Sequence, residues 1–155
     1  MTALFLAFLI GVLVGLRCLT PPAVLAWAAT LGWIGFATGP LHFLANKIVV
    51  VALTLAALGE LIGDKLPSSP SRTAPLGLYA RIVLGAFSGG CIAMAGSLSF
   101  WLGAPLGLIG GLLGCFGGFQ MRTRTVKALK CPDFVIALLE DAVAIGGSLF
   151  VVSRF

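Results

Sequence analysis

The acidic residues of this chain are few, and almost all lie in or against apolar segments. There are five of them: Glu60, Asp64, Asp133, Glu140 and Asp141. Glu60 follows an apolar run that begins at residue 48, and the pair at 140–141 interrupts another between 134 and 145. A charge in hydrocarbon costs about 3 kcal/mol, so it needs a partner, water or a role. We therefore expect the chemistry of the protein at these carboxylates.

The spacing of these carboxylates limits what they can do. Glu60 and Asp64 are four positions apart and share one face of a helix. Asp133 and Glu140 share another, whereas Asp141 points about 100° away from Glu140. Buried carboxylates exchange protons, bind a cation or pair with arginine. An arginine can instead hold a phosphate or carboxylate through two parallel hydrogen bonds.

Simpler structural roles stay open for the same residues. Asp64 with Lys65 fits a helix end, and Asp133 suits the start of the last helix. Glu60 fits either an interfacial position or a structural pair with Arg17 or Lys65. The pair at 140–141 is deepest, so at least one member faces the interior, where Arg17 or Arg122 is available as a structural partner.

Composition places the chain in a membrane. It has 155 residues, of which 59% are hydrophobic and 10% charged, and 21 are glycine. A soluble domain of this length has too few polar side chains to cover so much apolar surface. Glycine is tolerated in membrane helices and lets backbones approach closely. We expect one integral membrane domain over 1–155, without a cleavable signal peptide, because no basic region precedes the first apolar stretch.

Hydropathy predicts an all-α, polytopic transmembrane bundle of about six apolar segments. The first two are short: fourteen helical residues reach about 21 Å, against a hydrocarbon core of about 30 Å. They are either thin spans or a re-entrant hairpin with its tip near residues 17–22. Predicted breaks include Gly39-Pro40, Gly103-Ala-Pro105 and a basic loop over 121–132. The segments are 3–16, 22–38, 43–63, 80–99, 103–120 and 133–152.

The basic residues predict the orientation. Only Lys47 and Arg154 lie on the side of the termini, so both termini are expected outside and the basic connections in the cytoplasm. Glu60, about one turn deep, and Glu140, about 10 Å deep, then approach Arg17 in the cytoplasmic half of the bundle. The predicted substrate or ion pathway contains Arg17, Glu60, Asp64, Glu140 and Asp141. The predicted cytoplasmic basic patch contains Lys65, Arg72, Arg122 and Arg124, near the further basic residues Arg81, Lys127 and Lys130.

Other site types receive little support from the sequence. His42 is the only histidine, so we predict no metal site and no cofactor. The four cysteines form no CxxC pair and are read as small core residues, with a structural or catalytic thiol as the alternative: Cys18, Cys91, Cys115 and Cys131. No basic-aromatic pattern points to nucleic acid. The expected partners are membrane lipid, a small solute or ion, and further copies in a homo-oligomer.

Three motifs resemble a known bacterial membrane family, the domain of unknown function 4126. They are Gly15-Leu-Arg17-x-x-Thr20-Pro21, Glu60-x-x-x-Asp64-Lys65-Leu-Pro67-x-x-Pro70-x-Arg72 and Leu139-Glu140-Asp141-x-x-Ala144. The resemblance covers most of the chain, and it implies a compact multi-helix protein, in the bacterial inner membrane, whose three motifs belong to one design. It implies no activity.

Three functions compete. The first is a small transporter or channel, in which proton-coupled movement of an anionic or zwitterionic solute fits the mixture of arginine and acid. The second is a non-catalytic membrane subunit or scaffold. The third is an enzyme acting on a lipid phosphate, with Asp64 or Asp141 as base or metal ligand, although no usual catalytic pattern is present.

Overall fold

The computed structural model describes residues 2–35, 41–64, 75–129 and 133–155. Within them the chain is helical and has no strand, as predicted. The elements run in the order α1 (Thr2–Leu16), α2 (Thr20–Thr30), the short 3-10 helix η1 (His42–Ala45), α3 (Lys47–Gly63), α4 (Pro75–Ala95), α5 (Phe100–Leu129) and α6 (Asp133–Val152).

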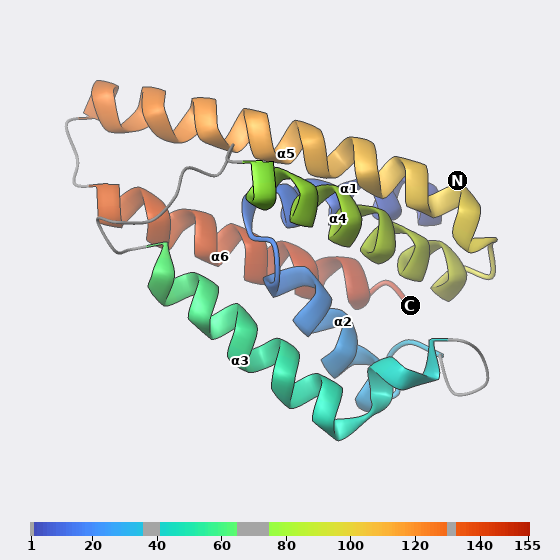
Figure 1. Ribbon diagram of the computed structural model, residues 1–155. Coiled ribbons are helices and arrows are strands. Elements are labelled where there is room, and N and C mark those ends of the chain that lie inside the picture. The colour runs from blue at the N-terminus through green and yellow to red at the C-terminus, as the bar shows by residue number, and fades with distance from the viewer. Residues whose placement is uncertain (1, 36–40, 65–74, 130–132) are drawn as a thin grey trace.

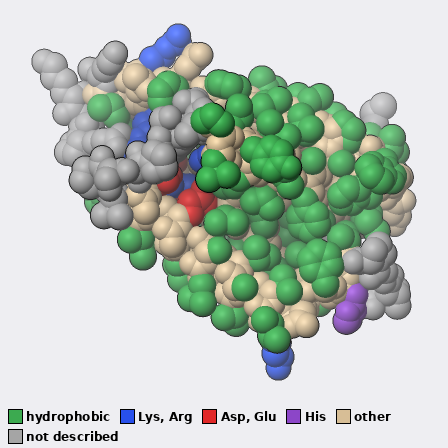
Figure 2. All heavy atoms as spheres, in the orientation of Figure 1, with side chains coloured by type: hydrophobic (Ala, Val, Ile, Leu, Met, Phe, Trp, Pro, Cys, Tyr) green, Lys and Arg blue, Asp and Glu red, His purple; other side chains and the backbone are tan. Residues whose placement is uncertain are grey.

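Three helices are long and apolar enough to cross a membrane. They are α4, α5 over Phe100–Val126, and α6 over Phe134–Val152. The remaining predicted segments give shorter helices, with 15 residues in α1, 11 in α2 and 17 in α3. Each of the six described α-helices exposes large apolar side chains, and Figure 2 shows one face of the molecule largely covered by them. Water would not favour such a surface, whereas lipid would.

Helices α1, α4 and α5 pack pairwise through glycines (Figure 1). A Cβ built on Gly107 of α5 would lie 2.2 Å from the carbonyl oxygen of Gly85 in α4. One built on Gly11 of α1 would lie 2.2 Å from the carbonyl oxygen of Gly107. The three backbones therefore touch where side chains would hold them apart. Glycine thus lets these helix backbones approach closely, as the composition indicated.

Helix α2 belongs to the other side of the molecule. It leaves α1 at a break over residues 17–19 and packs against α3 and α6 (Figure 1). The indole N–H of Trp27 donates to the hydroxyl of Thr54 in α3 at 3.0 Å. Because α1 packs mainly on α4 and α5, the first two helices diverge and do not form a close-packed hairpin.

Two predicted helix boundaries are wrong for a local reason. Helix α2 ends at Thr30, because Gly32 adopts φ 75° and the N–H of Trp33 bonds to the carbonyl of Ala28 at 2.9 Å. The turn from α4 to α5 lies at residues 96–99, where Ser97 has φ 60°. Both ends are left-handed C-terminal caps, which hydropathy does not register. Pro105, expected in the turn, lies inside α5.

The predicted basic loop is also wrong in its first part, because α5 continues to Leu129. The residues after 119 are mostly polar, and they include good helix formers such as glutamine, methionine, arginine and lysine. Hydropathy falls there while helix propensity does not. As a result, the charged end of α5 is a helical extension that carries Arg122 next to α6.

One end of the molecule collects the charged side chains. Helices α1, α3 and α5 finish towards this end, and α4 and α6 begin there, while both termini lie towards the opposite end (Figure 1). This shared end brings together residues that are far apart in the sequence.

Candidate functional site

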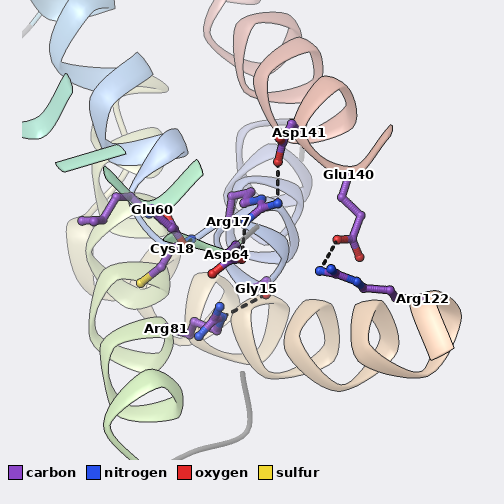
Figure 3. Close-up of polar contacts among 10 residues, drawn as sticks. Gly15, Arg17, Cys18, Glu60, Asp64, Arg81, Arg122, Glu140 and Asp141 are labelled. Carbon is purple, nitrogen blue, oxygen red and sulfur yellow. Dashed lines mark hydrogen bonds and ion pairs between the residues drawn. The ribbon is translucent and has the colours of Figure 1, made fainter. Parts of the chain in front are cut away.

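The centre of the charged cluster is Arg17, directly after α1. Its side chain is fully buried, with 0% of its surface exposed. Nη1 donates a hydrogen bond to Oδ2 of Asp64, which follows α3. Nη2 lies 2.6 Å from Oδ1 of Asp141 in α6. One buried guanidinium therefore joins two carboxylates from two different helices (Figure 3).

Glu60 binds backbone instead of a cation. Its Oε1 accepts the N–H of Cys18 and its Oε2 accepts the N–H of Leu19, each at 2.7 Å. Leu19 is the N-cap of α2 and makes no side-chain cap. The carboxylate thus caps the N-terminus of α2 from another helix, where the helix dipole favours a negative charge.

Arg81 performs the opposite task at the end of α1. Its Nε donates to the carbonyl of Gly15 at 3.1 Å, and its Nη1 to the carbonyl of Gly77 at 3.0 Å. Gly15 is in the last turn of α1, where carbonyls lack helical partners and a cation is favourable. The break between α1 and α2 is therefore closed by an arginine on one side and Glu60 on the other (Figure 3).

A second ion pair lies beside this cluster. Nη1 of Arg122 in α5 is 3.5 Å from Oε2 of Glu140 in α6. Both side chains are partly accessible, at 16% and 12%. Arg124, two positions further along α5, is exposed. Adjacent carboxylates on α6 thus serve different partners: Glu140 meets Arg122, whose side chain is 16% exposed, and Asp141 meets the fully buried Arg17.

Each helix buries only a narrow face, and the residues on that face determine which charged side chains point into the protein. In α6 the buried positions include Ala137, Asp141, Ala144, Ser148 and Val151, which recur every three or four residues. A single stripe of this kind packs inward while the rest of the helix is exposed. Asp141 is in the stripe, and Glu140 is at its edge.

Helix α3 follows the same rule. Its buried residues are Val50 and Ala57, and Glu60 and Asp64 continue the same face towards the break. Asn46 starts the helix by accepting the N–H of Ile48 through its side chain at 2.9 Å. Because α3 begins at this position, the carboxylates of Glu60 and Asp64 at its other end lie beside the break between α1 and α2.

The predicted site residues separate into distinct groups. Asp64 and Asp141 meet Arg17, Glu60 meets the two amides after Arg17, and Glu140 meets Arg122. Arg124 stands apart on the surface. Lys65 and Arg72 lie outside the described residues, as do the Pro67–Pro70 run, Lys130 and Cys131. Asp133 is the first residue of α6, in keeping with its predicted position.

Sequence reasoning missed two features of the site. Arg81 counted only towards orientation, although the one cation of an apolar helix, nearly two turns from its start, could have been tested as a partner for another helix end. The Glu60–amide contact had a weaker signal: Pro21 and Pro22, which lack N–H groups, follow the break and indicate a buried helix start.

Other described features lie elsewhere or play structural parts. One hollow of about 390 Å³ is lined by Gly32, Trp33, Val152, Ser153 and Phe155, far from Arg17. Cys18, Cys91 and Cys115 are buried. In the described part of the chain, no three histidine, cysteine, aspartate or glutamate side chains are grouped to hold a metal ion. Asp64 and Asp141, the residues that an enzyme would use, both engage Arg17.

Fold and site together define a class: helical proteins with spans long and apolar enough for a membrane and a buried charged cluster at one end. The chain belongs to the family described as a domain of unknown function, DUF4126, whose model matches residues 4–153. This match confirms the resemblance given by the three motifs. Neither the curated proteins nor the solved structures contain a match.

Proposed function

We propose that the protein is a small integral membrane transporter or channel, with its solute or ion site at the charged cluster. The observation that carries the proposal is Arg17, fully buried between Asp64 and Asp141 at a break between two helices. Broken helices with buried charge are how membrane transporters expose backbone and charge to a solute without exposing them to lipid.

The chemistry of the cluster favours a proton-coupled movement of an anionic or zwitterionic solute. Arginine supplies directed donors for an anion, and the neighbouring carboxylates can take up and release protons. The proposed pathway residues are Arg17, Glu60, Asp64, Glu140 and Asp141. Lys65, Arg72, Arg122 and Arg124 form the proposed basic patch at its cytoplasmic mouth.

The proposal includes a bacterial inner-membrane location with both termini outside and six membrane segments, of which α1, α2 and α3 are thin or part-way segments. Such short helices shield little polar interior from lipid. A homo-oligomer would supply the missing cover, with membrane lipid around it.

Flux in proteoliposomes tests the function. We expect the wild-type protein to move a small carboxylate or amino acid above the rate of empty liposomes. Arg17→Ala and Glu140→Gln should reduce that flux, while Arg154→Ala, which changes an exposed arginine near the C-terminus and outside the basic patch, serves as the control for charge loss. Background flux for the wild type with every solute tried would overturn the proposal.

The second candidate is a non-catalytic membrane subunit. It is favoured by the fact that Glu60, Asp64, Glu140 and Asp141 each have a partner within the chain, as in a structural network. In that case Arg17→Ala would first change the assembly seen on native gels. Flux would then stay at background for wild type and variant alike.

A further inference from the structure

The carboxylate of Glu60 is held in the way a free carboxylate would be held. Two consecutive amides, those of Cys18 and Leu19, each donate to a different oxygen at 2.7 Å. This arrangement matches a planar, two-oxygen group and requires nothing else of the glutamate side chain. Glu60 is also only half-buried, so its carboxylate can leave towards water.

We propose that these two amides form a binding site for small carboxylates, that Glu60 is its resident occupant, and that a solute carboxylate displaces Glu60. The inference rests on the proposed transport function and names its substrate class. The amides precede α2, a helix of 11 residues, whose N-terminus favours a negative charge. Because Pro21 and Pro22 have no N–H, few other donors of the first turn compete for the anion.

The residues on either side of the two amides each have a buried polar atom without a hydrogen-bond partner among the described residues. Thr20, the first residue of α2, is 4% exposed, and its Oγ1 has no hydrogen-bond partner among the described residues. Nε of Arg17, the residue before the two amides, is likewise buried and has no such partner. Buried polar atoms normally have partners, and one left without a partner at a functional position calls for an explanation. A solute carboxylate can use these groups, whereas a glutamate anchored on α3 does not.

The surrounding charges suit one monovalent anion. Arg17 is the first residue of the break and holds Asp64 and Asp141, and Arg81 binds the carbonyl of Gly15 just before the break. When a solute carboxylate enters and Glu60 moves out, the two amides keep one negative partner. The site thus exchanges one carboxylate for another, which selects small carboxylates over cations.

Acetate binding to the purified full-length protein in detergent tests the inference. Calorimetry would compare sodium acetate with sodium chloride at equal ionic strength. Glu60→Gln places an amide N–H against one of the two backbone donors, so the resident occupant is weakened. We expect acetate affinity to rise about tenfold over the wild type, the gain from removing roughly one competing hydrogen bond. Asp133→Asn, which removes a carboxylate at the first residue of α6, is the matched control and should bind acetate as the wild type does.

Two further variants keep the test decisive. Glu60→Asp retains the charge but is too short to reach both amides, and it replaces Glu60→Gln if that variant fails to fold. Thr20→Val, combined with either one, should lower acetate affinity without loss of stability, because it removes a hydroxyl that makes no hydrogen bond in the fold.

Unchanged acetate affinity in both Glu60 variants, or an equal gain in Asp133→Asn, would overturn the inference. These outcomes are separable from those of the transport test, since binding in detergent needs no gradient. Flux without acetate binding removes the carboxylate site and leaves transport standing. Acetate binding with only background flux leaves the site and removes transport.

Discussion

Arg17 and Asp141 approach to 2.6 Å between Nη2 and Oδ1, although one lies at the end of the first helix and the other in the last. Asp64, after α3, binds the same guanidinium. The glycine-packed group of α1, α4 and α5 is thereby tied to α3 and α6 at one buried side chain. Helix α3 packs mainly against α2 and η1. Its connection to α1 is therefore made by the charged side chains more than by apolar packing.

The two adjacent carboxylates of α6 should differ in their effect on stability. Asp141→Asn removes a charge from a buried pair and should lower the free energy of unfolding by about 2 kcal/mol. Glu140→Gln acts on a partly exposed pair at 3.5 Å and should cost below about 1 kcal/mol. Unfolding midpoints in detergent micelles measure both. Equal losses would show that the two pairs do not differ in burial as described.

Arg17 should couple to its carboxylates non-additively. Arg17→Met leaves Asp64 and Asp141 close together without their cation, and should destabilise the protein by about 3 kcal/mol. Adding Asp141→Asn removes one of the uncompensated charges, so the double variant should be more stable than Arg17→Met alone. A double-mutant cycle on unfolding free energies provides the measurement, with the exposed Arg124→Met as the control. Simple additivity would contradict a shared site.

The sequence predicted helices well where apolar character and helix length coincide. The first segment, expected over 3–16, is Thr2–Leu16, and the last, expected over 133–152, is Asp133–Val152. It failed where backbone capping decides, as at Gly32 and Ser97, since a left-handed residue ends a helix whatever its hydropathy. It also failed at the charged end of α5, where helix propensity outlasts hydropathy.

The site could be predicted as a location but not as a set of contacts. The direction of the helices was enough to bring Arg17, Asp64 and Asp141 to one end. Which carboxylate pairs with which donor depends on how each helix is rotated about its axis. That rotation follows from the buried faces of α3 and α6, which are known only from the structure. Glu60 shows the limit most clearly, because its partners are backbone amides, for which Pro21 and Pro22 give only a weak signal in the sequence.

The contact of three helices at Gly107 should be intolerant of a single methyl group. Gly107→Ala would place a Cβ 2.2 Å from the carbonyl oxygen of Gly85, and backbone cannot yield as a side-chain tip can. We expect a loss of about 2 kcal/mol or failure to fold. Gly117→Ala in the same helix has nothing within 4 Å and should be neutral. Fluorescence-detected size exclusion and thermal melts compare the two, and a well-folded Gly107→Ala protein would refute the close packing.

The orientation makes the final prediction, and cysteine labelling in intact cells tests it. Arg154→Cys, near the C-terminus, and Arg124→Cys, at the charged end of α5, both place a thiol at an exposed position. The native thiols at 18, 91 and 115 are buried, and Cys131 is changed to serine in both variants. If both termini face outside, a membrane-impermeant maleimide modifies the thiol at 154 in intact cells and the thiol at 124 only after the membrane is opened. The reverse pattern would place the charged cluster outside. Labelling of both thiols in intact cells would contradict a single orientation, because it would show that the basic residues do not determine how the chain inserts.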